Sequence, residues 1–317
     1  MVSLLPIKAF KNDIGAFDSE SLIEAYRYLR TLKTQGVNVV VVNTSYTGAC
    51  ELMTELEREE IEALVNAGIT VVGAAGNDAR SNDSVPMCPG NLGADPQRNP
   101  LGVMGILSIA NAAPGPVSSN RWANGPSLHP WSNFGRALVN TAAPGTVVFA
   151  NKEFRSGTSM AAPHVSGIVA LMYSVNPFIT PPEVEQILSN SSMSTNFGFP
   201  VRSQGLLNAE RAVKAAASSA IVGIVRYDGR PLPKAVLTMK AGGVTVQSLS
   251  DSRGVFFFKR PRTGTPLEIS AQKEKIFFET QTSENKSPST PPRFVFEGEN
   301  SHEEGGVSQG PRGAALR

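Results

Sequence analysis

The sequence predicts an α/β protein whose parallel sheet is covered by helices on both faces, followed by a small all-β sandwich. Over the first two thirds of the chain, short apolar segments alternate with segments of helical periodicity, a rhythm typical of βαβ units. After Ser219 the helical periodicity ends, and short strand-like segments separated by turn residues follow. The 317 residues, 41% of them hydrophobic, suffice for one sizeable core and a smaller one.

Residue type and spacing predict the first elements. Residues 4–10 are largely apolar and predict a buried strand that opens the chain without a lead-in. Asp18 is a suitable N-cap for a helix with apolar residues at helical spacing. Residues 39–42 are four consecutive valines, which predict a strand buried on both faces. The apolar face of the helix after Asp18 consists of Leu22, Ala25, Tyr26, Leu29 and Leu32.

A second helix ends at Gly68, and buried strands are predicted at residues 69–74 and 103–110. Ligands of such sheets gather outside the carboxyl ends of the strands, which points to residues 43–48 and 74–77. The apolar face of the second helix consists of Leu52, Leu56, Ile61, Leu64 and Val65.

The following segment, residues 78–100, is rich in Gly, Pro, Asn and Ser and predicts a long surface loop. Thr180, two prolines and Glu183 predict a helix that begins with a capping box. Asn208 is a suitable N-cap for a last helix over residues 209–217.

The chain after Ser219 predicts an antiparallel β-sandwich over residues 220–297 and a polar, Gly-rich, disordered tail over 298–317. Asp228-Gly229 and Arg253-Gly254 mark turns between strands. This turn pattern resembles the carboxypeptidase-regulatory-like domains often appended to secreted enzymes. The expected strands are residues 221–226, 235–240, 244–249, 255–259, 267–271, 276–280 and 293–296.

Composition excludes some classes of protein. The net charge of +2 comes without a basic stripe, so no nucleic-acid partner is implied. No apolar stretch reaches membrane-spanning length, and the first ten residues are too short and too soon charged for a signal peptide. Cys50 and Cys88 both lie in predicted loops, where they are either a disulfide or two unrelated thiols.

Residues 156–167 read Ser-Gly-Thr-Ser-Met-Ala-Ala-Pro-His-Val-Ser-Gly. Gly157 permits a tight turn, and Thr158 and Ser159 suit the first positions of a helix. Pro163 is tolerated only in a first turn. Ser159 is therefore placed where backbone N–H groups and the positive end of the helix dipole are close by, a setting that suits a nucleophile whose attack creates an oxyanion. A simple N-cap serine is the alternative; it would be preferred for a lone Gly-Thr-Ser, but the length of the eight-residue run 157–164 argues against it.

This run resembles the nucleophile motif of the subtilisin-like serine peptidases, and the resemblance extends over residues 1–217. In that family Ser159 corresponds to the nucleophile. Residues 71–77, Val-Val-Gly-Ala-Ala-Gly-Asn, are similar to the strand that ends in the oxyanion asparagine, so the resemblance implies that Asn77 and the Ser159 backbone N–H stabilise the oxyanion. An asparagine that simply turns the chain after a strand is the alternative for Asn77.

The resemblance also implies where an extended polypeptide substrate would bind. Residues 43–48, Asn-Thr-Ser-Tyr-Thr-Gly, are similar to the family's Ser-Leu-Gly substrate strand, with tyrosine and threonine where leucine and glycine are usual. Residues 131–135 and 142–145 match connecting loops and are interpreted as structural. Ser45, Tyr46 and Thr47 would pair with the substrate backbone, and Ala74, Ala75 and Gly76 would form the opposite wall.

The family's other catalytic motifs are missing. A serine hydroxyl needs an adjacent base, yet neither a His-Gly-Thr-His run nor an Asp-Ser-Gly or Asp-Thr-Gly run occurs. The histidines are His129, His164 and His302, and none is expected to be catalytic; Asp13-Ile-Gly15 is only a faint match to the aspartate run. We therefore interpret the first domain, residues 1–219, as an N-terminally truncated subtilisin-like domain whose isolated chain is inactive.

Three functions stay open on the sequence. The first is an incomplete serine endopeptidase, the second a non-catalytic peptide-binding scaffold, and the third a split protease completed by an N-terminal fragment on a partner chain. The family resemblance implies an extracellular or periplasmic location. Family members often bind structural calcium, but no carboxylate cluster indicates a metal site here, and no cofactor is assignable.

Overall fold

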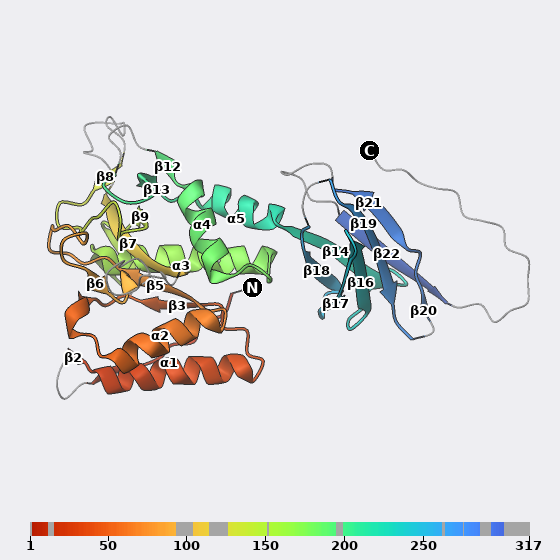
Figure 1. Cartoon of the computed structure of the whole chain (residues 1–317), viewed down its shortest axis with the longest axis horizontal. Coiled ribbons are helices and arrows are strands. Elements are labelled where there is room, and N and C mark those ends of the chain that lie inside the picture. The colour runs from red at the N-terminus through yellow and green to blue at the C-terminus, as the bar shows by residue number, and fades with distance from the viewer. Residues whose placement is uncertain are drawn as a thin grey trace, which may run out of the picture. The chain divides into compact units, whose positions relative to one another are not determined.

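The computed structural model describes residues 2–11, 16–92, 104–113, 126–150, 152–194, 199–261, 264–274, 276–285 and 293–300. The chain divides into two compact units, Met1–Ser219 (unit 1) and Ala220–Arg317 (unit 2). Figure 1 labels their helices and strands. Unit 1 is α/β and unit 2 contains only strands among its described residues, so the predicted fold class is confirmed.

Unit 1 is built on a seven-stranded sheet of order β12-β13-β9-β7-β5-β3, with β8 paired to β7. The strands from β3 to β9 are parallel neighbours, with Val42 opposite Val71 and Val72 opposite Leu107. The bounds are β3 (Val41–Thr44), β5 (Thr70–Ala74), β7 (Ile106–Ala113), β8 (Ser127–Leu128), β9 (Thr141–Pro144), β12 (Met193–Ser194) and β13 (Gly205–Leu206).

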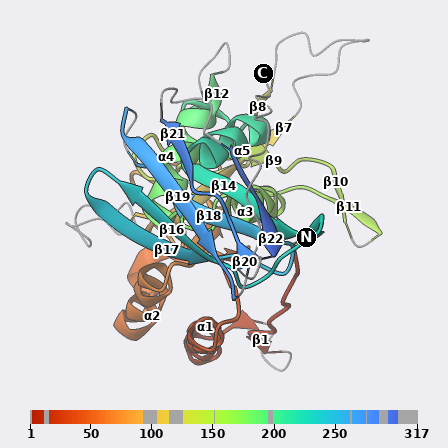
Figure 2. The ribbon, with the colours of Figure 1, turned by 90° about the vertical axis from the view of Figure 1, so that its right-hand side faces the viewer.

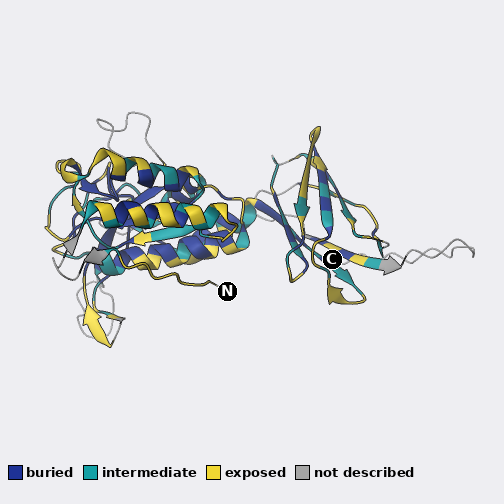
Figure 3. Ribbon diagram, turned by 90° about the horizontal axis from the view of Figure 1, so that it is seen from below, coloured by how far each residue is buried: buried dark blue, intermediate teal, exposed yellow. Residues whose placement is uncertain are grey.

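Helices cover both faces of this sheet, as Figures 1 and 3 show. On one face lie α1 (Ser19–Thr34) and α2 (Glu55–Asn66); on the other lie α3 (Thr158–Val175), α4 (Pro181–Ser191) and α5 (Ala209–Ser218). None of these described helices is long and apolar enough to cross a membrane.

The predicted helix caps are confirmed. Asp18 accepts a hydrogen bond from the backbone N–H of Ser21, and Asn208 accepts one from that of Arg211. Thr180 and Glu183 form the full capping box, with prolines in the first turn of α4. Each side chain satisfies N–H groups that have no partner within the helix, which fixes where the helix starts.

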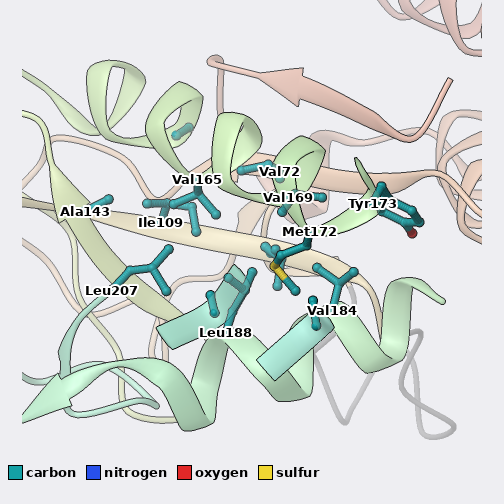
Figure 4. Close-up of a cluster of buried hydrophobic side chains, with 14 of the residues drawn as sticks. Val72, Ile109, Ala143, Val165, Val169, Met172, Tyr173, Val184, Leu188 and Leu207 are labelled. Carbon is teal, nitrogen blue, oxygen red and sulfur yellow. The ribbon is translucent and has the colours of Figure 1, made fainter. Parts of the chain in front are cut away.

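The core of unit 1 lies between α3, α4, α5 and the sheet. Figure 4 shows Met172 of α3 packed among side chains of the sheet and of α4. Val72 and Ile109 are fully buried because β5 and β7 have helices on both sides. The cluster includes Val165, Val169, Met172, Val184, Leu188 and Leu207.

Two expectations for the first part of the chain are wrong. Residues 4–9 form no strand, and Leu4 is 93% exposed, because no neighbouring strand among the described residues offers them backbone partners. Residues 10 and 11 form only the short β1 (Phe10–Lys11), paired with β2 (Ala16–Phe17). The valines at 39–42 are half-buried, because β3 begins at Val41 and is the edge strand of the sheet.

Two leucines assigned to the face of α2 do not belong to it. Leu52 lies before the helix, in a 3₁₀ turn (Cys50–Leu52), and Leu56 lies in its first turn; they are 78% and 44% exposed. Ile61, Leu64 and Val65 are buried as predicted. Residues 142–145 are mostly strand β9 rather than a connecting loop.

Unit 2 contains two sheets, whose strands face the viewer in Figure 2. One has the order β15-β14-β22-β20 with β18 paired to β14, and the other β17-β16-β19-β21. Phe256, Phe258 and Phe296 are buried in one core with Leu237 and Ile269. The bounds are β14 (Ala220–Tyr227), β15 (Arg230–Pro231), β16 (Val236–Ala241), β17 (Val244–Leu249), β18 (Val255–Lys259), β19 (Pro266–Gln272), β20 (Ile276–Phe277), β21 (Gln281–Glu284) and β22 (Arg293–Asn300).

The predicted strands of unit 2 match these bounds closely, apart from its C-terminal part. β20 is shorter than predicted. β21 was not predicted because all four of its residues are polar and show no apolar alternation. Strand β22 continues to Asn300, so residues 298–300 belong to the sheet rather than to a tail. The remainder of the expected tail, including His302, lies outside the described residues.

We predict that Met172→Ala lowers the free energy of unfolding of unit 1 by about 2–5 kcal/mol, because the fully buried side chain leaves a cavity. The neighbouring Leu171→Ala is the control, since Leu171 is 47% exposed. Urea unfolding followed by tryptophan fluorescence measures the difference, because both tryptophans precede Ser219 in the sequence. Equal losses for the two variants would contradict the packing described above.

Candidate functional site

The site is formed where the end of β5 meets the first turn of α3. Asn77 follows β5, and its Oδ1 accepts hydrogen bonds from the Thr158 backbone N–H at 2.9 Å and the Thr158 hydroxyl at 3.2 Å. The N-cap residue of α3 is Gly157, which has no side chain to cap the helix. Asn77 therefore supplies from a distant part of the chain an acceptor that an N-cap side chain usually provides.

This cap orients the Asn77 amide. Because the amide oxygen is held by Thr158, the amide NH₂ is left as a free pair of donors. A Cβ placed on Gly157 would lie 3.5 Å from Asn77 Oδ1, 3.6 Å from Asn77 Nδ2 and 3.8 Å from the Ser159 backbone nitrogen. The Asn77 carboxamide and the Ser159 nitrogen are thus close to one point, beside the partly exposed Ser159. Two N–H donors around one space can stabilise an oxygen that gains negative charge.

A buried asparagine network holds the segment before Asn77. Asn133 Nδ2 and Asn82 Nδ2 both donate to the Ala75 carbonyl, at 3.1 and 2.9 Å. Gly76 has a φ of 109° and its Cβ would lie 2.4 Å from Asn133 Nδ2, so only glycine fits there. The sequence motif 131–135 predicted a connecting loop but did not show that Asn133 holds the backbone on either side of Asn77.

The residues expected to form one wall of a substrate cleft are held tightly. Ala74 and Ala75 are fully buried, and the Ala75 N–H donates to Ile109. The Gly76 N–H donates to the Thr158 hydroxyl at 3.2 Å. That these residues form a wall of a substrate cleft stays a prediction.

Ser45 is brought next to Ser159. The Ser159 hydroxyl donates to the Ser45 carbonyl at 2.9 Å, and the Ser45 hydroxyl donates to the Ser159 carbonyl at 2.9 Å. Asn43 Nδ2 donates to the Ser45 hydroxyl at 2.8 Å, and Asn43 Oδ1 accepts from Ser166 on α3 at 3.1 Å. The segment after β3 is thereby fastened along α3.

Tyr46 and Thr47 direct their side chains into the protein. The hydroxyl of Tyr46 bonds to that of Tyr26 on α1, and burial raises the pKa of both phenols. Nearby Glu57 is buried too, and burial raises the pKa of its carboxyl although Ser19 donates a hydrogen bond to it. Thr47 donates to the Cys88 carbonyl at 3.2 Å. Substrate contacts of Tyr46 and Thr47 would therefore come from their backbones.

Cys50 and Cys88 form a disulfide, which decides between the two alternatives left open by the sequence. Both are almost fully buried, beside the antiparallel pair of β4 (Gly48–Ala49) and β6 (Met87–Cys88). The two segments are 38 residues apart in sequence, so spacing alone could not show that they are neighbours. The disulfide fixes the end of the segment that contains Ser45.

No histidine of the described residues contacts Ser159. His164 is exposed, and its Nδ1 lies 2.9 Å from the Met160 carbonyl one turn earlier in α3. His129 packs edge-on against Trp131, with ring centroids 5.2 Å apart. Asp13 and His302 lie outside the described residues. His129 and His164 thus have partners other than Ser159.

Metal ligation finds no support in the described part of the chain. No group of three or more His, Cys, Asp or Glu side chains there could hold a metal ion.

The chain is similar to known proteins of one family. Residues 1–223 match the model of the subtilase family. An extracellular protease of Xanthomonas campestris pv. campestris is 34% identical over 180 residues, covering 56% of this chain and 28% of that protein. Subtilisin-like protease 2 of Trichophyton verrucosum is 30% identical over 191 residues, covering 57% and 39%. The chain thus spans well under half the length of these relatives.

A solved structure of the subtilase cytotoxin SubAB assembly has the same fold as unit 1. The TM-score is 0.53 at 23% sequence identity, and the match covers 64% of this chain and 66% of that one.

We predict that the double variant Cys50→Ser/Cys88→Ser lowers the free energy of unfolding by about 4 kcal/mol, because a disulfide between residues 38 apart restricts the unfolded chain. Thermal unfolding with and without a reducing agent measures the effect. Reduction should lower the midpoint of the parent and leave that of the double variant unchanged. An unchanged midpoint for the reduced parent would refute a stabilising role.

Proposed function

Because this chain belongs to the subtilase family, we propose that it is the nucleophile-bearing part of a serine-type endopeptidase. Ser159 is the nucleophile, and Asn77 Nδ2 with the Ser159 backbone N–H forms the oxyanion hole. The observation that carries the proposal is that Asn77 caps α3 through Thr158, which places its amide nitrogen and the Ser159 nitrogen 3.6 and 3.8 Å from one point beside Gly157, with the capping oxygen at 3.5 Å.

The proposed reaction uses this geometry directly. Ser159 Oγ attacks a peptide carbonyl carbon, and the carbonyl oxygen becomes negatively charged. The two donors and the N-terminal dipole of α3 stabilise that charge without having to reorganise, because Asn77 is already held by Thr158. An extended polypeptide lies along residues 45–47 through backbone hydrogen bonds.

We propose that the base comes from outside these 317 residues. The Ser159 proton currently points at the Ser45 carbonyl, which cannot accept it as a base does. An earlier segment of the same polypeptide or a partner chain would supply the aspartate and histidine. The position of β3 at the edge of the sheet supports an added segment, because among the described strands β3 pairs only with β5. Ser45 lies just past the end of β3. A parallel strand added there would end at the same rim as Ser45.

The second candidate is a peptide-binding scaffold without catalysis. The reciprocal hydrogen bonds between Ser45 and Ser159 favour it, because they occupy the nucleophile's hydroxyl. Asn77 favours the peptidase, since capping α3 needs only its oxygen, which a carboxylate would supply equally well. In the scaffold, unit 2 would act as an adhesion module.

We also propose that the protein works outside the cytoplasm. The Cys50–Cys88 disulfide fits an oxidising compartment, and the Xanthomonas relative is named an extracellular protease.

We predict that the 317-residue chain alone does not cleave a denatured protein substrate, because loss of the base costs about 10⁶ in kcat in subtilisin itself. Coexpression with an encoded segment that carries Asp-x-Gly and His-Gly-x-His runs should restore cleavage. The DNA upstream of Met1 and neighbouring genes are the places to search for it. Ser159→Ala is the control and should abolish the restored activity. Serine-dependent cleavage by the chain alone would contradict the missing base; restoration that survives Ser159→Ala would contradict the nucleophile.

We predict that Asn77→Asp and Asn77→Ala in the completed enzyme both lower kcat by about 10²–10³, the loss known for removing this donor from subtilisin. Their stabilities should differ. Aspartate still caps α3 and is favoured by the helix dipole, whereas alanine loses the cap at a cost of about 1 kcal/mol. Kinetics and urea unfolding of both variants separate the donor from the cap. Full activity of Asn77→Asp would show that the Asn77 NH₂ is not needed.

A further inference from the structure

A short hairpin precedes the Ser159 turn. It consists of β10 (Val148–Ala150) and β11 (Glu153–Arg155), with Phe149 opposite Phe154. The two rings are 5.0 Å apart between centroids and are 64% and 69% exposed. Glu153 and Arg155 bond to each other at 2.7 Å and flank Phe154 along β11. Side chains alternate along a strand, so the hairpin has an aromatic face and a charged face.

The base of this hairpin is fixed to the helix that carries Ser159. The Gly157 N–H donates to the Gly145 carbonyl at 2.8 Å and joins the two ends of the hairpin. A Cβ on Gly145 would lie 2.9 Å from the Cβ of Ala161, in the first turn of α3. The aromatic face is therefore attached to the proposed active site through short, packed connections.

Chain length limits how far the aromatic face lies from the nucleophile. Phe154 is five residues before Ser159. An extended chain covers at most about 3.3–3.6 Å per residue, so the two Cα atoms are at most about 18 Å apart. A bound substrate in extended conformation spans about 18 Å with about five residues. Five residues on one side of the peptide bond held at Ser159 therefore suffice to reach Phe154.

We propose that Phe149 and Phe154 form an exosite that binds an apolar or aromatic side chain of an extended polypeptide, within about five residues of the bond held at Ser159. The identity of the occupant rests on the proposed function, which the exosite extends to a substrate preference. The two paired rings expose apolar surface to water. An apolar side chain of the bound polypeptide would cover that surface and so remove it from water. The Glu153–Arg155 pair keeps the opposite face hydrated.

Binding, rather than turnover, tests the exosite. The full chain with Ser159→Ala is titrated with short fluorescein-labelled peptides that are identical except for one phenylalanine, moved stepwise along a Ser/Gly sequence. We expect Kd to be about tenfold lower for phenylalanine at one or two positions than for the peptide without it. In Phe149→Ser/Phe154→Ser that preference should disappear.

Glu153→Gln is the matched control, because it changes the charged face of the same hairpin and should keep the preference. Thermal unfolding confirms that each variant is folded. The exosite is wrong if the parent binds no peptide, shows no phenylalanine preference, or keeps it in the double variant. It is also wrong if sedimentation shows that the double mutation turns a dimer into a monomer, since the aromatic face is then a contact between two copies. The proposed function is tested separately, by the Ser159-dependent cleavage measured after coexpression, and these binding results do not affect that test.

Discussion

The hydrogen bond between Asn77 and the first turn of α3 is the contact on which the site depends. It joins the carboxyl end of a central strand to the amino end of the helix that carries Ser159. One amide group serves two purposes: its oxygen satisfies a helix N–H that Gly157 cannot cap, and its nitrogen is left facing the space beside Ser159. Because the cap is also a structural bond, the proposed donor is positioned before any ligand arrives, which is the condition under which such donors are most effective.

Contacts inside the protein hold the backbone segments that border the site. Ser45 is tied to Ser159, Tyr46 reaches Tyr26 on α1, and the Cys50–Cys88 disulfide closes the end of the segment. The buried Asn82 and Asn133 hold the segment before Asn77 by donating to the Ala75 carbonyl. The side chains of Ser45, Tyr46 and Thr47 are thus bonded within the protein, which is compatible with the substrate pairing through backbone groups that the motif implied.

The expectations that held and those that failed have a common cause. Helix caps at Asp18, Thr180 and Asn208 were correct because a cap is decided by residues three or four apart. The strand expected at residues 4–10 did not form, and residues 39–42 were less buried than their composition implied, because a strand's pairing and burial depend on neighbours that local sequence does not specify. The hairpin pair Phe149 and Phe154 was not predicted for the same reason.

The sequence by itself determined the fold class, the start of α3 at the Ser159 motif, the likeness of residues 71–77 to an oxyanion strand and the lack of a matching histidine motif. These depend on residue order over short distances. Only the tertiary structure decided that Asn77 caps the helix of Ser159, that Ser45 occupies its hydroxyl, and that Cys50 meets Cys88. Those contacts join segments 38 to 114 residues apart, and only packing of the sheet and helices brings them together.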